Sequence, residues 1–166
     1  MKNVRTLVAA MATLLTATLA QADINIGISL PLTGPASGLG IPMKNQFLLW
    51  PQTVAGEKVN LIILDDATDP TKGVVNAKRF VTEDRVDIIG GSAATPVAAA
   101  MAEVAAESNT VQIAFSPVGL PPGKDTWTFR LPQSTGVMAH AMVEHMKKNG
   151  VKTVGFIGFA DAYGEG

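Results

Sequence analysis

The 166-residue chain is 47% apolar and 16% charged, carries a formal net charge of −1, and contains no cysteine. The apolar content is sufficient for a packed core, whereas the sparse and balanced charge argues against an electrostatic nucleic-acid binder. The absence of cysteine excludes disulfide scaffolds, thiolate metal sites and cysteine nucleophiles.

Residues 1–22 have the pattern of a secretory signal peptide. Lys2 and Arg5 form a positive start, residues 7–19 form a short apolar run, and an A-x-A cleavage signal ends at Ala22. The apolar run is too short for a membrane anchor. We therefore expect cleavage after Ala22, export to a bacterial periplasm, and no stable membrane insertion of the mature chain.

Short apolar runs bounded by turn residues predict six β-strands in the mature chain. The first run alternates apolar and polar residues before it becomes wholly apolar, and the third ends in Gly90 and Gly91. The six predicted strands cover residues 24–30, 58–64, 86–89, 111–115, 127–130 and 151–158.

Helices are predicted between these strands. Asp69 and Pro70 are a typical helix cap and first-turn proline, and Thr95 with Pro96 repeats that arrangement. In the last helix one face carries three methionines and His145. We expect His145 to be partly buried beside the methionines. The predicted helices cover approximately residues 41–54, 70–84, 96–107 and 134–149.

This regular alternation predicts an α/β fold, a doubly wound parallel sheet with helices on both faces. In such sheets ligands bind beyond the carboxyl ends of the strands. The loop of Ser92, Ala93, Ala94 and Thr95 is predicted to lie there, at the positive end of a helix dipole that favours anions. The loop is thus a candidate carboxylate site, although the residues alone are more simply explained as turn and cap residues.

Other patterns do not predict chemistry. The aspartates of segment 65–69 fit neither a metal loop nor a glycosidase pair. His140 and His145 are five residues apart, so they do not share a helical face as metal ligands would. Ser92 lacks the Gly-x-Ser-x-Gly pattern of an activated serine. We therefore expect no catalytic residue, no metal and no cofactor.

Five motifs carry a family resemblance when they are taken together and in order. They are Leu30-Pro31-Leu32-Thr33-Gly34-Pro35, Asp65-Asp66-Ala67-Thr68-Asp69-Pro70, the loop from Gly90 to Pro96, Ser116-Pro117, and Asp161-Ala162-Tyr163-Gly164-Glu165-Gly166. Over residues 24–166 the chain resembles the type I periplasmic binding proteins, and within them the leucine/isoleucine/valine-binding group. The resemblance implies a non-enzymatic solute receptor that delivers its ligand to an inner-membrane ABC permease.

The same resemblance implies two α/β lobes joined by a hinge near residues 131–133, with the ligand in the cleft between them. Residues 23–132 would form an incomplete N-terminal lobe, and residues 133–166 the truncated start of the second lobe. We therefore expect weak or no ligand binding by this chain alone. A non-functional remnant of a longer protein is an alternative interpretation.

The resemblance also implies the ligand contacts. The carboxylate would be held by the loops after the third and fourth strands, a tyrosine would reach in from the second lobe, and Leu39 would lie over the ligand side chain. The complete set of expected contacts is Leu39, Ser92, Ala93, Ala94, Thr95, Ser116, Val118, Leu120 and Tyr163.

Two positions leave the ligand open. Where amino-acid binders place a hydroxyl to hold the ammonium group, this chain has the segment 118–122, which offers none. Leu39 also leaves more space than the aromatic residue often found there. The ligand is therefore either a branched-chain amino acid or an aromatic or keto carboxylate. An exported hydrolase that uses Ser92 is the rival class of function.

Overall fold

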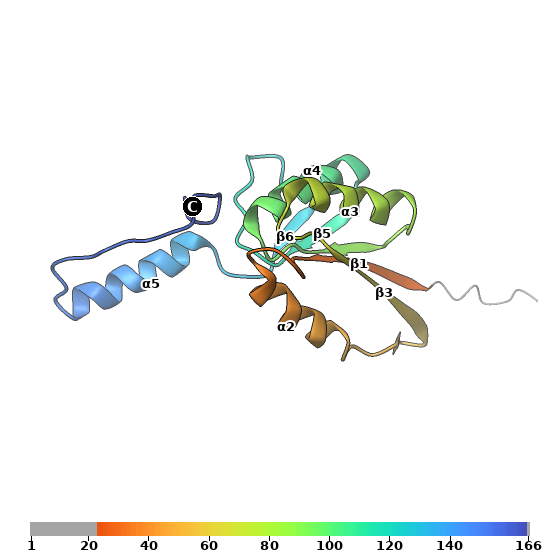
Figure 1. Ribbon diagram of the computed structural model, residues 1–166, viewed down its shortest axis with the longest axis horizontal. Helices are drawn as coiled ribbons and strands as arrows, with labels where there is room; N and C mark the ends of the chain where they lie inside the picture. The colour runs from red at the N-terminus through yellow and green to blue at the C-terminus, as the bar shows by residue number, and fades with distance from the viewer. Residues whose placement is uncertain (1–22, 166) are drawn as a thin grey trace, which may run out of the picture.

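The computed structural model describes residues 23–165, and these residues form one six-stranded sheet (Figure 1). The strand order is β2-β3-β1-β4-β5-β6, and every neighbouring pair is parallel except β2 with β3. The strands are β1 (Ile24–Leu30), β2 (Thr53–Val54), β3 (Glu57–Asp65), β4 (Ile88–Gly90), β5 (Val111–Ala114) and β6 (Thr128–Arg130). The predicted α/β class and parallel sheet are confirmed, whereas the predicted signal peptide lies outside the described residues.

Helices lie on both faces of this sheet (Figure 1). They are α2 (Ser37–Phe47), α3 (Pro70–Thr82), α4 (Thr95–Ser108) and α5 (Thr135–Lys148). α3 and α4 pack side by side on one face, α2 lies on the other, and α5 stands away from the sheet. No helix within residues 23–165 is both long and apolar enough to cross a membrane.

The core is divided by the sheet into two layers. On the face of α3 and α4, Phe80 and Ile89 are fully buried. On the face of α2, Ile28 and Phe47 are buried. Burying each such side chain contributes about 1.5–3 kcal/mol relative to leaving it exposed, so these two layers hold the helices in fixed positions around the strand ends.

Two glycines allow the layers to approach closely. A Cβ atom on Gly27 would lie 2.5 Å from the Phe80 ring, and one on Gly73 would lie 2.4 Å from Cγ1 of Val97. Both separations are far below van der Waals contact, so α3 can reach the sheet and α4 only because these positions lack side chains.

α2 begins earlier than the sequence predicts. The Ala36 N–H donates to the Thr68 hydroxyl at 3.1 Å, and the Leu39 N–H donates to the Ala36 carbonyl at 2.9 Å. Because these contacts organise the turn before it, the helix begins at Ser37 and contains Pro42. The predicted span of 41–54 is therefore wrong at both ends.

The segment expected to end that helix instead forms a hairpin at the sheet edge. Ala55 and Gly56 connect β2 to β3, with φ values of 51° and 91°. Two successive positive φ values are typical of a type I′ turn, the preferred two-residue hairpin loop. Alanine is unusual in this role, which is why the sequence gives little signal for the hairpin.

The segment after β6 differs most from expectation. α5 forms where predicted, with the Ser134 hydroxyl accepting a hydrogen bond from the Val137 N–H at 3.4 Å, but none of its residues is buried. The prediction of a partly buried His145 is therefore wrong. Residues 151–158 form no strand, because no described strand lies beside them to supply the hydrogen bonds that a strand needs.

A buried glutamine ties three elements together. Nε2 of Gln112, on β5, donates to the Gly91 carbonyl at 2.9 Å and to the Ala98 carbonyl at 3.1 Å. Its Oε1 accepts a hydrogen bond from the Thr128 hydroxyl at 3.0 Å. Gln112 is fully buried with both ends of its amide satisfied, so it fixes β6 and the start of α4 relative to β5.

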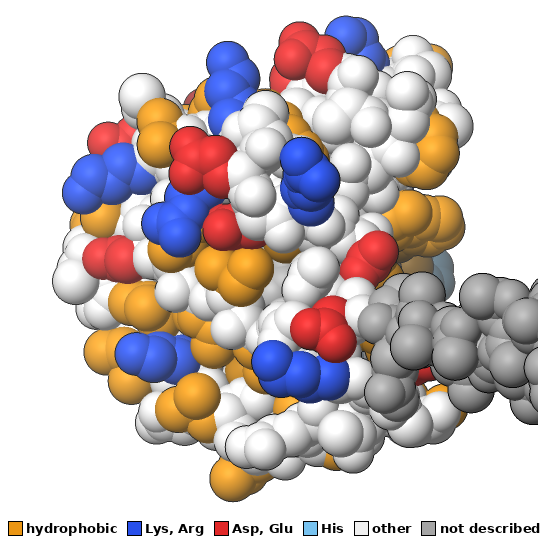
Figure 2. Space-filling view, turned by 90° about the vertical axis from the view of Figure 1, so that its right-hand side faces the viewer, with side chains coloured by type: hydrophobic (Ala, Val, Ile, Leu, Met, Phe, Trp, Pro, Cys, Tyr) orange, Lys and Arg blue, Asp and Glu red, His pale blue; other side chains and the backbone are white. Residues whose placement is uncertain are grey.

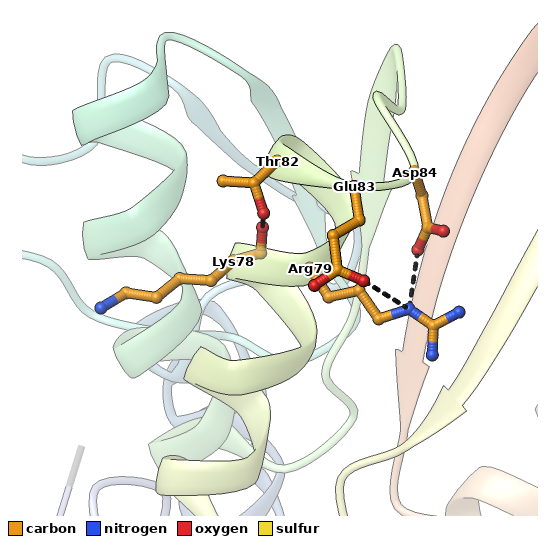
Figure 3. Close-up of polar contacts among 5 residues, drawn as sticks. All are labelled: Lys78, Arg79, Thr82, Glu83 and Asp84. Atoms are coloured by element: carbon orange, nitrogen blue, oxygen red, sulfur yellow. Dashed lines mark hydrogen bonds and ion pairs between the residues drawn. The ribbon is translucent and has the colours of Figure 1, made fainter.

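The end of α3 is fixed by side-chain contacts (Figure 3). Nε of Arg79 lies 3.2 Å from Asp84 and 4.0 Å from Glu83, and the Thr82 hydroxyl donates to the Lys78 carbonyl at 2.8 Å. On the face drawn in Figure 2, basic and acidic side chains are interspersed with apolar ones, without a broad patch of one sign. Arg79 and Glu83 are exposed and Asp84 is half-buried; ion pairs at the protein surface stabilise a fold by about 1 kcal/mol at most.

Candidate functional site

A cavity of about 800 Å³ lies beyond the carboxyl ends of the parallel strands. Loops after β1, β3, β4 and β5 form one wall, and residues of α5 and the C-terminal segment form the other. The lining residues are Pro35, Ala36, Gly38, Leu39, Thr68, Pro70, Ala93, Ala94, Thr95, Pro96, Phe115, Ser116, Pro117, Pro132, Met138, Phe159, Asp161 and Tyr163. This position is where open α/β sheets bind ligands.

The floor of the cavity offers hydrogen-bond donors at the start of α4. The helix begins at Thr95, with Ala94 as its N-cap residue and Pro96 in its first turn. The expectation that the Thr95 hydroxyl caps the helix is wrong, since no side chain makes a capping hydrogen bond there. Among the described residues, neither the Thr95 hydroxyl nor the N–H groups of Ala93 and Thr95 have a hydrogen-bond partner.

Ser116 adds a donor beside this helix start. It follows β5, only 2% of the residue is exposed, and its hydroxyl finds no hydrogen-bond partner among the described residues. A buried hydroxyl without a partner costs about 1–3 kcal/mol. The Ser116 hydroxyl is therefore free to form a hydrogen bond with a group from outside the chain.

Ser92 lies beneath this floor. Its side chain is fully buried and is not part of the cavity lining. The Ser92 hydroxyl accepts a hydrogen bond from the Ala94 N–H at 3.2 Å and makes a second hydrogen bond with the buried carboxyl of Asp66. Ser92 therefore shapes the loop from below, and no described histidine lies in contact with it to make it a nucleophile.

Asp66 connects the loops after β3 and β4. Its carboxyl accepts hydrogen bonds from the Ser29 hydroxyl at 3.2 Å and from the Thr68 N–H at 3.0 Å. Burial raises the pKa of Asp66, and the hydrogen bonds from Ser92, Thr68 and Ser29 offset this only in part. Since Thr68 and Ala94 both line the cavity, Asp66 and Ser92 together hold two of its loops in register.

The pKa of the neighbouring Asp65 carboxyl is shifted in the opposite direction, below its ordinary value. It accepts hydrogen bonds from the Thr33 hydroxyl at 2.6 Å and from the N–H groups of Leu32 and Ala67, each at 2.8 Å. Burial acts to raise the pKa of Asp65, but these hydrogen bonds outweigh it and lower the pKa below its ordinary value. Asp65 therefore anchors the loop after β1 as an ionised acceptor.

Val118 and Leu120 lie away from the cavity. Val118 is 1% exposed and packs against Ala98 and Ala114, with Leu120 beside them. The Val118 carbonyl accepts a hydrogen bond from Nε of Arg130. The chain turns into the lobe after Pro117, so of the expected contacts in this loop only Ser116 lines the cavity.

The opposite wall is formed by the C-terminal segment. Leu39 and Tyr163 line the cavity from the two sides, and both are exposed. Asp161 also lines it, although it is not among the expected ligand contacts. Its place in the Asp-Ala-Tyr-Gly motif, two residues before Tyr163, was the available signal. No group of metal-ligating side chains is found within residues 23–165.

The sheet, the loops at its carboxyl edge and the open cavity define an α/β lobe of the kind that binds ligands at the ends of its strands. The family model for periplasmic binding proteins matches residues 23–166, and the chain belongs to that family. It is 32% identical to the Leu/Ile/Val-binding protein homolog 3 of Brucella melitensis, over 96% of this chain and 45% of that relative. The chain therefore spans less than half the length of this relative.

Solved structures agree with this assignment. An extracellular ligand-binding receptor from Rhodopseudomonas palustris is 43% identical, with a TM-score of 0.82 over 86% of this chain and 40% of that one. A solute-binding protein of an ABC transporter from Rhodopseudomonas palustris BisB5, in complex with 3,4-dihydroxybenzoic acid, is 25% identical, with a TM-score of 0.77 over 86% of this chain and 41% of that one. The family is one of ligand-binding receptors rather than enzymes.

Proposed function

We propose that this protein is a receptor component of an ABC importer and that its cavity holds a small carboxylate. The observation that carries the proposal is the Ser116 hydroxyl, which is buried at the cavity beside the start of α4 and has no partner among the described residues. A ligand oxygen that accepts from this hydroxyl removes the cost of leaving it unsatisfied.

The carboxylate end of the ligand would lie against the start of α4. There it would accept hydrogen bonds from the hydroxyls of Ser116 and Thr95 and from the N–H groups of Ala93 and Thr95. The α4 dipole favours an anion at this position, and hydrogen bonds to a charged acceptor are stronger than those to a neutral one. Ser92 would support this arrangement from beneath the loop.

The body of the ligand would contact an apolar wall. Leu39, Phe115 and Phe159 line the cavity and suit an aromatic ring or a branched aliphatic chain. Of the two ligand classes that the sequence leaves open, we favour the aromatic carboxylate, because the buried Val118 side chain packs into the lobe and the segment 118–122 adds no side chain to the cavity lining that could hold an ammonium group. The 3,4-dihydroxybenzoic acid complex of the structural relative supports this choice.

The wider role follows from the family. Residues 1–22 would direct export to the periplasm and would then be removed. A second lobe would close over the ligand about the linker at residues 131–133, and the closed form would be recognised by an inner-membrane permease. Ligand would favour closure because only the closed state contacts it from both sides.

Substitution of Ser116 with alanine tests the carboxylate site. Because the hydroxyl has no partner, Ser116→Ala should leave the free energy of unfolding unchanged or raise it, while the affinity for benzoate falls by about tenfold. A protein-observed NMR titration measures this change, because it detects even weak binding.

Ser108→Ala is the matched control. The Ser108 hydroxyl lies at the far end of α4 and donates to the Val104 carbonyl at 2.7 Å, so this variant should lose stability and retain benzoate binding. Equal benzoate affinity in the wild type and Ser116→Ala would contradict the proposal. So would an absence of chemical-shift changes when benzoate or leucine is added to the folded wild type.

A further inference from the structure

One lining residue of the cavity carries a charge. Of the side chains that line it within the described part of the chain, Asp161 alone is ionisable as an acid or a base at neutral pH, and no lysine, arginine or histidine is among them. The proposed ligand is itself an anion. The wall that holds Asp161 therefore repels the ligand carboxylate, whereas the wall at the start of α4 attracts it. The cavity is therefore electrostatically asymmetric.

The Asp161 side chain is held in a defined orientation. Its Oδ1 accepts hydrogen bonds from the Tyr163 N–H at 2.9 Å and from the Gly164 N–H at 3.1 Å. This is the local turn that aspartate and asparagine side chains favour. Oδ2 has no hydrogen-bond partner within residues 23–165, so one carboxylate oxygen remains able to accept a hydrogen bond from a ligand.

Asp161 and the residues proposed to hold the ligand carboxylate lie on opposite walls of the cavity. Thr95 begins α4 and Ser116 follows β5, both in the main lobe, whereas Asp161 lies in the segment after α5, which Figure 1 shows beside the lobe. A ligand that fills the cavity with its carboxylate against α4 would then have its other end toward Asp161. A carboxylate accepts hydrogen bonds and donates none, so that other end must be a donor.

We propose that Asp161 makes this cavity selective for monocarboxylates that carry a hydrogen-bond donor at the end remote from the carboxylate, such as para-hydroxylated aromatic acids. This inference rests on the proposed function and names the substrate class of the same site. A ligand whose ring has no polar substituent leaves Oδ2 of Asp161 without a partner. It therefore makes one charged hydrogen bond fewer than a para-hydroxylated ligand. A dicarboxylate places its second negative charge against Asp161 and is rejected, because like charges at short range repel.

The test compares para-hydroxybenzoate, benzoate and terephthalate on the full chain by NMR titration. The wild type should bind para-hydroxybenzoate about tenfold more tightly than benzoate, the usual worth of one hydrogen bond to a charged group. Terephthalate should bind more weakly than benzoate. In Asp161→Asn, where the side-chain oxygen can still accept from Tyr163 and Gly164, the preference for the hydroxyl should fall and terephthalate should gain affinity.

Glu165→Gln is the control, since it removes the same charge from the same segment outside the cavity lining and should leave all three affinities unchanged. Equal binding of para-hydroxybenzoate and benzoate by the wild type would overturn the role of Asp161, as would an unchanged ranking in Asp161→Asn. Both results would leave the carboxylate site intact. Failure of all three probes to bind the folded wild type would instead overturn the proposed function, and this inference with it.

Discussion

The buried carboxyl of Asp66 and the hydroxyl of Ser92 are hydrogen-bonded to each other beneath the cavity floor. They come from the loops after β3 and β4, and each also bonds to the backbone of a cavity loop, Asp66 to the Thr68 N–H and Ser92 to the Ala94 N–H. Because the two side chains share one hydrogen bond, the position of either loop depends on the other. Their effects on stability can be measured separately from ligand binding.

Ser92→Ala should lower the free energy of unfolding by about 1–3 kcal/mol, because it leaves the Ala94 N–H and the buried Asp66 carboxyl each without one partner. Urea denaturation followed by circular dichroism measures this loss. Ser37→Ala is the control, since the half-buried Ser37 hydroxyl makes no hydrogen bond to the described residues. Equal stability of the two variants would show that the Ser92 bonds contribute nothing.

Asp66→Asn should change how stability depends on pH. Because burial raises the pKa of Asp66 above 3.8, the folded chain binds this proton more tightly than the unfolded chain. Asp66 therefore contributes stability below its unfolded pKa, and this contribution is lost as pH rises through the raised folded pKa. Urea titrations in neutral and mildly acidic buffers should show the wild type gaining stability relative to Asp66→Asn on acidification; a constant difference would contradict the prediction.

Asp65→Asn should show the opposite dependence. The pKa of Asp65 is held below 3.8 by its hydrogen bonds, so Asp65 contributes stability above its unfolded pKa and loses it as pH falls through the lowered folded pKa. At neutral pH the variant should be less stable by about 1–2 kcal/mol, from weakened hydrogen bonds to a charged acceptor. The deficit should shrink in strongly acidic buffer. A deficit that grows on acidification would refute this.

Gly73→Ala should destabilise the contact between α3 and α4. The new Cβ would lie 2.4 Å from Cγ1 of Val97, and such overpacking costs about 1–3 kcal/mol. The second substitution Val97→Ala should recover part of that loss by removing the clash. Gly136→Ala, where a Cβ meets nothing within 4 Å, should be neutral or stabilising in thermal melts. Similar losses at both glycines would exclude the packing explanation.

The order of strands and helices could be predicted because its signals are local. Asp69 accepts a hydrogen bond from the Thr71 N–H at 2.7 Å and Pro70 begins α3, as the cap and first-turn proline indicate. The segment 151–158 has an equally strong apolar pattern, yet it forms no strand, because pairing depends on a neighbour that the pattern does not specify. Thr95 fails as a cap because the helix begins one residue earlier than the pattern indicates, so that Ala94 occupies the N-cap position.

The candidate site could be predicted only in part. Thr95, Ser116 and Leu39 line the cavity, and they lie in or just beyond the loops that follow β4, β5 and β1, whose position follows from the parallel sheet. Ser92 and Val118 lie in the same loops but point into the lobe, which depends on backbone geometry that sequence spacing does not reveal. The role of Asp161 depends on which charges share the cavity with it, and that is known only once the distant segments are brought together.

The amide of Gln112 has a mechanical consequence. It donates to the carbonyl of Gly91, immediately before the cavity loop, and accepts from the hydroxyl of Thr128 on β6, the strand from which the chain leaves the lobe. A displacement of β6 would therefore be passed to the Gly91 backbone, next to Ser92, through these two hydrogen bonds. Motion about the proposed hinge at residues 131–133 would therefore be coupled to the shape of the proposed carboxylate site through the fully buried side chain of Gln112.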